Sequence, residues 1–300
     1  MKKTRFIAIP SVLLCIVTFI YFNRINNLNT NRTSHDTYIS YGFLDSDGNI
    51  LSNGSKLDLK FKEKINHTLD LDQVIEENRE YLLIALVDFK QVMFKVDGKY
   101  YSCYKFNTSK SDHIEFNLEI DIPKKSKELD YILIRKPYYM PHKKNIESLL
   151  PLQTVLPIRF KINDLNDEIK YEKMLRTYTE GPSDNIWISN KENNFDLLYE
   201  TNENDDIFLT LGNDGNEVID YAVVLFNNWE QVEFNDGDMT KFLKVNPKEK
   251  QSLKFNLPDV EEDTYFQAIA FPLPYKVDPN DMMSTNAFGS CKFIIKNNAN

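Results

Sequence analysis

Few side chains in this sequence have the types and spacing that catalysis needs. The four histidines stand at positions 35, 67, 113 and 142, so the chain beyond His142 has no imidazole to act as a base or a metal ligand. The sequence has no nucleophile elbow, zinc-protease motif, Gly-rich phosphate loop or Cys-x-x-Cys pair. Because the chain has 45 acidic residues, two carboxylates that are close in sequence carry little information. We therefore predict that the protein is not an enzyme; a hydrolase with an unrecognised acidic site is the least favoured alternative.

One segment has the opening pattern of a calcium loop. Asp45-Ser46-Asp47-Gly48-Asn49 places oxygen ligands at alternate positions, with a glycine to turn the chain. A complete EF-hand loop has a glutamate at its twelfth position, where this chain has Lys56. Asp45, Asp47 and Asn49 are therefore weak candidates for calcium ligands, and a hairpin turn is the favoured explanation. Asp236–Asp238 and residues 202–206 are weaker candidates still, and no other cofactor is expected.

Aromatic side chains mark two loops that could contact a partner. Tyr138, Tyr139 and Met140 follow Pro137, and Tyr275 lies in the loop after Pro272. Tyrosine is enriched at protein interfaces, and its large ring ends in a polar hydroxyl. We therefore predict that these two loops bind a protein partner. If they were exposed, Trp187 and Trp229 would instead offer stacking faces for an envelope carbohydrate or polymer.

The elements that position these side chains form an internal repeat. Tyr81-LLIALVDFKQVMF matches Tyr221-AVVLFNNWEQVEF at a constant offset of 140 residues, with Phe89 opposite Trp229. Three further matches follow in the same order: Ile114-EFNL with Leu253-KFNL, Pro137 with Pro272, and Ile158-RFKI with Cys291-KFII. The repeat predicts that one domain is duplicated. It also favours a structural role for Phe89 and Trp229, because both copies have an aromatic residue at that position.

Apolar residues in each copy recur with period two or in short continuous runs, which indicates β-strands. The runs 81–87 and 221–226 are typical of central strands that are covered on both faces. About seven short strands in each copy, separated by Gly, Asn and Asp turns, resemble the architecture of an immunoglobulin-like β-sandwich. The predicted fold is thus all-β, with two tandem duplicated sandwich domains. Their predicted bounds are 36–163 and 193–300, joined by a connector at 164–192 that could begin with a short helix.

The opening segment predicts the compartment. Residues 6–22 contain no charge, and Lys2, Lys3 and Arg5 precede them, which favours a single membrane span with residues 1–5 in the cytoplasm. A cleaved signal peptide and a lipid-bearing Cys15 remain alternatives, and all three would export the rest of the chain. Residues 23–35 would form a stalk. Only Cys103 and Cys291 remain in the exported part, and two free thiols are favoured over a disulfide bond.

Charge is unevenly distributed along the chain. Residues 36–163 have 19 acidic and 19 basic side chains, whereas residues 193–300 have 19 acidic and 8 basic. The overall charge of −9 argues against nucleic-acid binding. The uncharged segment at residues 6–22 predicts a cell-membrane protein. The overall composition is typical of a low-GC bacterium. We expect protein docking, adhesion or assembly without catalysis; a module that binds envelope carbohydrate or polymer is the alternative.

Overall fold

The computed structural model describes residues 37–57, 59, 64–141, 150–164, 169–172, 176–178, 186–192 and 196–298. These residues form strands in four sheets and one short helix, α2 (Leu150–Gln153), so the all-β prediction is confirmed. The predicted span at residues 6–22 lies outside the described residues. Among the described residues, no helix is long and apolar enough to cross a membrane.

The first half of the molecule, residues 37–164, contains two sheets. Its outer sheet has the strand order β2 (Ile50–Leu51), β1 (Tyr38–Leu44), β3 (Lys64–Val74), β9 (Ser111–Asp121), β6 (Phe94–Val96) and β7 (Lys99–Tyr101). Its inner sheet has the order β11 (Val155–Lys161), β10 (Glu128–Arg135), β4 (Arg79–Val87) and β5 (Lys90–Gln91), and β8 (Cys103–Thr108) also pairs with β4. An apolar core that includes Leu69, Leu71, Tyr81 and Leu133 fills the space between these two sheets.

The second half, residues 176–298, is built in the same way. Its outer sheet has the order β12 (Arg176–Tyr178), β19 (Lys250–Asn256), β15 (Asp206–Gly212) and β13 (Ile186–Ser189). Its inner sheet has the order β14 (Glu200–Asn202), β22 (Phe293–Lys296), β20 (Thr264–Pro272), β16 (Ile219–Asn227) and β17 (Glu230–Val232). In that sheet β18 (Lys241–Val245) also pairs with β16, and β21 (Phe288–Gly289) pairs with β20.

The second half takes in part of the predicted connector. Strands β12 and β13 lie within residues 164–192, yet they pair with β19 and β15. Ile186 and Ile188 of β13 belong to the core of the second half. The sequence allowed a short helix at the start of the connector. Residues 169–172 of that stretch, which the structure describes, are not helical. The sequence match missed these strands because the compared segments of the repeat begin only at Tyr81 and Tyr221.

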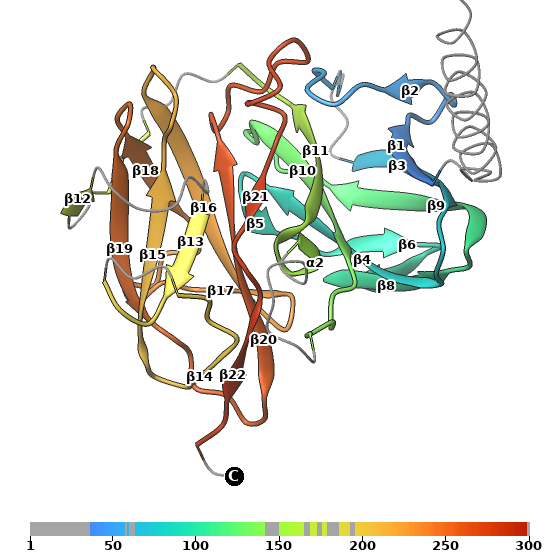
Figure 1. The fold of residues 1–300 in the computed structure, drawn as a ribbon. Coiled ribbons are helices and arrows are strands. Elements are labelled where there is room, and N and C mark those ends of the chain that lie inside the picture. The colour runs from blue at the N-terminus through green and yellow to red at the C-terminus, as the bar shows by residue number, and fades with distance from the viewer. Residues whose placement is uncertain are drawn as a thin grey trace, which may run out of the picture.

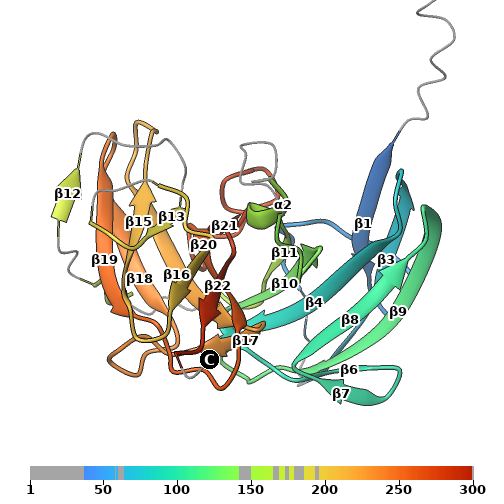
Figure 2. The same cartoon turned by 60° about the horizontal axis from the view of Figure 1, so that its bottom comes forward.

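A third apolar layer packs the two inner sheets against each other. Successive side chains of a strand point to opposite faces, so each inner strand divides its residues between two layers. In β4, Tyr81, Leu83 and Ala85 face the core of the first half, whereas Leu82, Ile84 and Leu86 face the second half. Strands β10, β16 and β20 divide in the same way. Figures 1 and 2 show the result, in which the inner sheets lie between the two outer sheets.

This double burial explains the continuous apolar runs in the sequence. Residues 81–86 and 221–225 are each at most 1% exposed, although an ordinary sandwich strand would present alternate side chains to solvent. The face that would otherwise be exposed is covered by the other half of the same chain. The prediction of strands covered on both faces is therefore confirmed, and the covering element is the repeat itself.

Equivalent hairpin turns follow β4 and β16. Asp88-Phe89 and Asn228-Trp229 each join two strands with two residues, and all four have positive φ, between 46° and 70°. Two consecutive positive φ angles define a type I′ turn, which rarely accommodates large side chains. Phe89 and Trp229 are held in this conformation by the third apolar layer, in which both are buried.

Two glutamines complete the contact between the halves. The backbone N–H of Gln91 donates to Oε1 of Gln231, and the backbone N–H of Gln231 donates to Oε1 of Gln91, both at 2.6 Å. Their amide groups donate to the carbonyl oxygens of Trp229 and Phe89, both at 2.9 Å. This reciprocal pattern is that of an interface with two-fold symmetry. The repeat positions that matched in the sequence therefore contact one another in space.

The structure corrects two of the four sequence matches by two residues. With the offset of 140 residues extended to β3 and β15, Leu69 corresponds to Leu209. Leu69 pairs with Phe116 and Leu209 pairs with Leu253, so Phe116 corresponds to Leu253. The loop after β10 matches the loop after β20 when Pro137 is aligned with Pro274, because the residues before both prolines, Lys136 and Leu273, have positive φ. A shift of two residues keeps every side chain on the same face of its strand, so the predicted inward positions were unaffected.

The third layer predicts a large effect for its central aromatic residue. Replacing Trp229 with Ala should lower the free energy of unfolding by about 3–5 kcal/mol, because a large buried ring is lost and leaves a cavity. Chemical denaturation measures the change. The matched control is Tyr100→Ala, since Tyr100 is an aromatic residue that is 55% exposed, and it should change stability by less than about 0.5 kcal/mol. Equal effects of the two variants would contradict the burial of Trp229 between the two halves.

Candidate functional site

The loop tyrosines predicted to bind a partner contact the other half of the same chain. Tyr138 follows β10, and its ring packs edge-on against Tyr265 of the second half at 5.4 Å. Tyr275 follows β20, and its ring lies 5.2 Å from that of Phe89 and 4.5 Å from Nζ of Lys127, both in the first half. Each loop therefore crosses to the opposite half.

The remaining members of the predicted binding set are largely covered. Trp229 is 2% exposed and Trp187 is 8% exposed, so neither side chain presents a face on which a sugar could stack. The Trp229 ring lies in the third apolar layer, 5.5 Å from Nζ of Lys292. Tyr139 and Met140 are partly buried beside Tyr138, and Nζ of Lys136 lies 5.4 Å from the Tyr139 ring. The sequence identified aromatic contact residues, but it could not show that the repeat itself supplies the contact.

The segment 45–49 forms the turn of the β1–β2 hairpin. Oδ1 of Asp45 accepts the backbone N–H groups of Asp47 and Asn49, both at 2.9 Å, and the Asn49 amide also donates to this carboxylate. Leu44 pairs with Ile50 directly across the turn. The favoured hairpin interpretation is therefore confirmed. At the weaker calcium candidate Asp236–Asp238, the Lys241 ammonium forms ion pairs with both carboxylates. Its Nζ lies 2.7 Å from the carboxylate of Asp238.

A buried arginine links the two halves. Arg159 of β11 is fully buried, and its guanidinium donates to Glu128 at 2.6 and 2.8 Å and to Asp130 at 3.2 Å. Its remaining nitrogen reaches the carbonyl oxygens of Pro272 and Asn286 in the second half, at 2.7 and 3.0 Å. Oε2 of Glu128 accepts the backbone N–H of Tyr275 at 2.7 Å. The ion pair thus holds the loop after β20 against the first half.

Lys292 occupies the equivalent repeat position in the second half. Its buried ammonium donates to the carbonyl oxygens of Lys136 and Pro137 in the first half, at 2.8 and 2.7 Å. Tyr265 and Gln267 stand where Glu128 and Asp130 stand in the first half, so Lys292 lacks the carboxylates that accompany Arg159. Burial lowers the pKa of Lys292 to about 7. The sequence match of Ile158-RFKI with Cys291-KFII already aligned the two cations, but nothing in it indicated their burial.

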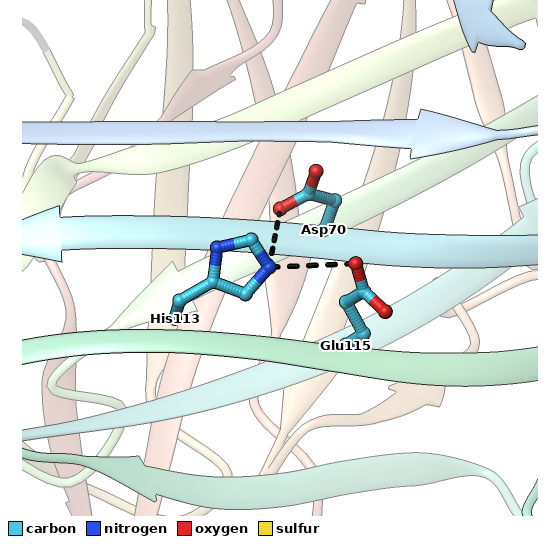
Figure 3. A group of neighbouring side chains, drawn as sticks. All are labelled: Asp70, His113 and Glu115. Atoms are coloured by element: carbon cyan, nitrogen blue, oxygen red, sulfur yellow. Dashed lines mark hydrogen bonds and ion pairs between the residues drawn. The ribbon is translucent and has the colours of Figure 1, made fainter. Parts of the chain in front are cut away.

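The outward side of β3 and β9 forms a polar face. It carries Asn66, Thr68, Asp70 and Asp72 from β3 and His113, Glu115, Asn117 and Glu119 from β9. A groove of about 570 Å³ lies at one end of this polar face. Its lining includes Asn66, Thr68, Asn117 and Lys95, together with Asp45 and Ser46 of the hairpin turn. At the other end Asp70, His113 and Glu115 approach one another, and among the described residues they are the group placed to hold a metal ion (Figure 3).

His67 lies beneath the polar face and is a core residue. It is 5% exposed, and its Nδ1 lies 3.0 Å from the Tyr131 hydroxyl within a cluster of aromatic rings. Burial lowers the pKa of His67 to about 4, so the ring is neutral at physiological pH. Cys103 and Cys291 are free thiols, as the sequence favoured.

The Arg159 cluster predicts opposite outcomes for two substitutions. Burial and the neighbouring Glu128 raise the pKa of Asp130 well above its usual value, so the folded state disfavours the charged form of this side chain. Asp130→Asn should therefore leave stability at pH 7 equal to or higher than that of the wild type, because folding no longer has to bury a carboxyl group whose charged form is disfavoured. Arg159→Met should lower it by about 3–5 kcal/mol, because Glu128 is left as an unpaired buried charge. Denaturant titration compares the two, and a larger loss for Asp130→Asn would contradict the assignment.

His67 predicts a pH dependence of stability. Its pKa is about 4 in the folded protein and 6.5 in an unfolded chain, so the unfolded state binds the extra proton between these values. Stability should therefore be complete above pH 6.5 and fall by about 3 kcal/mol as the pH drops to 4. The measurement is the free energy of unfolding against pH, in the wild type and in His67→Phe. The part of the slope that is due to His67 should vanish in the variant, and identical slopes would contradict this prediction.

Comparisons with known proteins identify no family. No model of a known protein family matches the chain, and no curated protein matches it in sequence. Among solved structures, the E. coli chaperone DraB is 8% identical, with 87% of this chain and 97% of that chain covered and a TM-score of 0.25. CBD12 from CALX1.2 is 9% identical, with 80% and 83% covered and a TM-score of 0.22. McoA multicopper oxidase from Aquifex aeolicus is 10% identical, with 87% of this chain and 65% of that chain covered and a TM-score of 0.22. TM-scores this low assign neither a fold family nor an activity, so the chain's own geometry is the basis for function.

Proposed function

We propose that this chain is a membrane-anchored protein that acts outside the cytoplasm in docking, adhesion or assembly, without catalysis. Residues 6–22 would anchor it in the cell membrane of a low-GC bacterium, with residues 1–5 in the cytoplasm. Two duplicated immunoglobulin-like sandwich domains would meet a protein partner. The third apolar layer and the reciprocal glutamines support this proposal, because they join both halves into one body that can present a fixed surface.

The observation that carries the docking proposal is a pair of exposed apolar side chains. Among the large apolar residues of the described segments, Met282 and Ile50 are the most exposed, at 88% and 80%. Ile50 follows the β1–β2 turn of the first half, and Met282 lies in the loop after β20 of the second half. Exposed apolar side chains are a mark of protein–protein contact surfaces, and the loops that carry these two residues are joined by a hydrogen bond from Asn53 to Thr285.

The loops that carry these residues lie against each other. We name residues 45–54 and 276–286 the loop surface. The Asn53 amide donates to the carbonyl oxygen of Thr285 at 3.2 Å. Gly54 has a φ of 88°, and a Cβ there would come within 2.5 Å of the Pro279 nitrogen, so the close approach requires glycine. The loop surface is therefore built from both halves, and loops that are already held together lose less entropy when a partner binds.

The groove on the polar face favours a second candidate function. Its amide, hydroxyl and charged side chains could form hydrogen bonds to a carbohydrate or other envelope polymer. Tyr100, which is 55% exposed, stands on β7, and Nζ of Lys95 at the groove lies 4.9 Å from its ring. An exposed ring beside polar donors is the arrangement that a sugar-binding module needs, so polymer binding is the alternative.

The loop surface is tested by a cross-linked pulldown from intact membranes, with the full-length chain as bait. The variant Ile50→Ser/Met282→Ser should lose a protein that the wild type recovers, because its apolar contacts are removed. The control is Val218→Ser, since Val218 is 46% exposed in a different loop, and it should recover the same protein. The thermal midpoints of all three proteins should agree, because none of the substituted side chains is buried.

Two results would contradict docking through the loop surface. Equal recovery of the partner by wild type and double variant would show that the contact lies elsewhere. Enrichment of envelope polymer with no specific protein would favour the second candidate. In that case Tyr100→Ala should lower polymer recovery, whereas the Ile50→Ser/Met282→Ser variant should not.

A further inference from the structure

Three side chains on the polar face converge from two neighbouring strands (Figure 3). Asp70 of β3 is directly opposite Glu115 of β9 in the antiparallel register. His113 precedes Glu115 by two residues, so it points to the same side of the sheet. The sequence places Asp70 more than forty residues from the other two, and only the pairing of β3 with β9 brings all three together.

The distances suit ligands of one metal ion. Nε2 of His113 lies 3.4 Å from Oε1 of Glu115 and 3.6 Å from Oδ1 of Asp70. One ligand atom from each of the three residues lies within 4.8 Å of the others. Zinc binds imidazole nitrogen and carboxylate oxygen at roughly 2.0–2.2 Å, which in a tetrahedral site separates neighbouring ligand atoms by about 3.3–3.5 Å. The two short separations match this spacing, and a small movement of the Asp70 or Glu115 side chain would complete it.

Asp70 and Glu115 place two carboxylates opposite each other on neighbouring strands, an arrangement that a bound cation would stabilise. Like charges directly opposite each other on neighbouring strands are destabilising, and Asp70 and Glu115 are such a pair. Other acids of the polar face have partners within the protein. Glu119 accepts from Lys95 at 2.6 Å and from Lys64 at 3.0 Å, and Asp72 accepts from the Tyr38 hydroxyl at 2.8 Å. Among the described residues, His113 supplies the only ion-pair contacts of Asp70 and Glu115.

We propose that Asp70, His113 and Glu115 form a binding site for a divalent metal ion of the zinc class. One imidazole with two carboxylates favours late first-row metals over calcium and magnesium, which prefer oxygen ligands throughout. Three protein ligands leave at least one coordination position open, as in zinc sites that bind water or a further ligand. The side chains of His113 and Glu115 are 55% and 56% exposed, so the ion is reachable from solvent. This site is independent of the loop surface and does not rest on the docking proposal.

The test uses the full-length chain, freed of metal with a chelator and purified in detergent. Zinc chloride is titrated in by calorimetry, and cobalt(II) replaces zinc so that its visible absorption reports the ligand geometry. We expect one saturable ion per chain at this site, with calcium and magnesium binding more weakly. His113→Ala and Glu115→Gln should each weaken zinc binding by at least about tenfold, the loss that even removal of an outer-shell partner causes.

Glu119→Gln is the matched control. It removes one carboxylate from the same face of the same strand, four residues from Glu115, and it should leave the zinc affinity unchanged. Because Glu115 and Glu119 both lie on the outward side of β9, neither substitution disturbs the core, and circular dichroism checks that the variants fold.

Three results would contradict the proposed metal site. Equal zinc affinity in wild type and Glu115→Gln would place any bound ion elsewhere, for example at the free thiols. Equal weakening by Glu115→Gln and Glu119→Gln would indicate diffuse attraction to an acidic surface. Calcium or magnesium affinity equal to that of zinc would rule out the proposed metal class.

Discussion

The apolar layer between the two inner sheets is the constraint on which the rest of the molecule depends. Strands β4, β10, β16 and β20 each present one set of side chains to their own core and the alternate set to the other half. Separating the halves would expose that second set to water at a cost that grows with the apolar area. The two sandwiches therefore behave as one folded unit, and the loops after β10 and β20 are fixed because each packs on the opposite half.

Polar groups inside this layer determine its alignment. Gln91 and Gln231 satisfy each other's backbone N–H groups, and Arg159 and Lys292 reach carbonyl oxygens at the ends of the opposite strands. Any other alignment of the halves would leave these buried groups without partners, which is costly in a low-dielectric interior. The apolar layer supplies the attraction, and the buried polar groups select one arrangement. The two copies differ at this position, because Glu128 and Asp130 accompany Arg159 whereas Tyr265 and Gln267 stand at the equivalent places beside Lys292.

The candidate sites were predictable to different degrees. The hairpin turn at residues 45–49 is local, so the Asp and Gly residues of the sequence were enough to favour it. Tyr138 and Tyr275 each contact the other half of the same chain, and these contacts depend on how the two halves pack, which no local sequence pattern shows. Asp70, His113 and Glu115 gave no motif at all, because their convergence depends on which residue of β3 faces which residue of β9. The loops that carry Ile50 and Met282 likewise meet only in the folded chain, where the Asn53 amide donates to the Thr285 carbonyl oxygen.

By itself, the sequence determined the all-β class, the inward side of each strand and the duplication. These features depend on the alternation of apolar side chains and on repeated segments, both of which are visible in the sequence. It also determined that some strands are covered on both faces, since the runs 81–87 and 221–226 have no polar side. Only the tertiary structure decided what covers them and which residues meet across strands. Those contacts join residues that are far apart in sequence, and a shift of two residues in register leaves the apolar pattern unchanged while it changes every cross-strand neighbour.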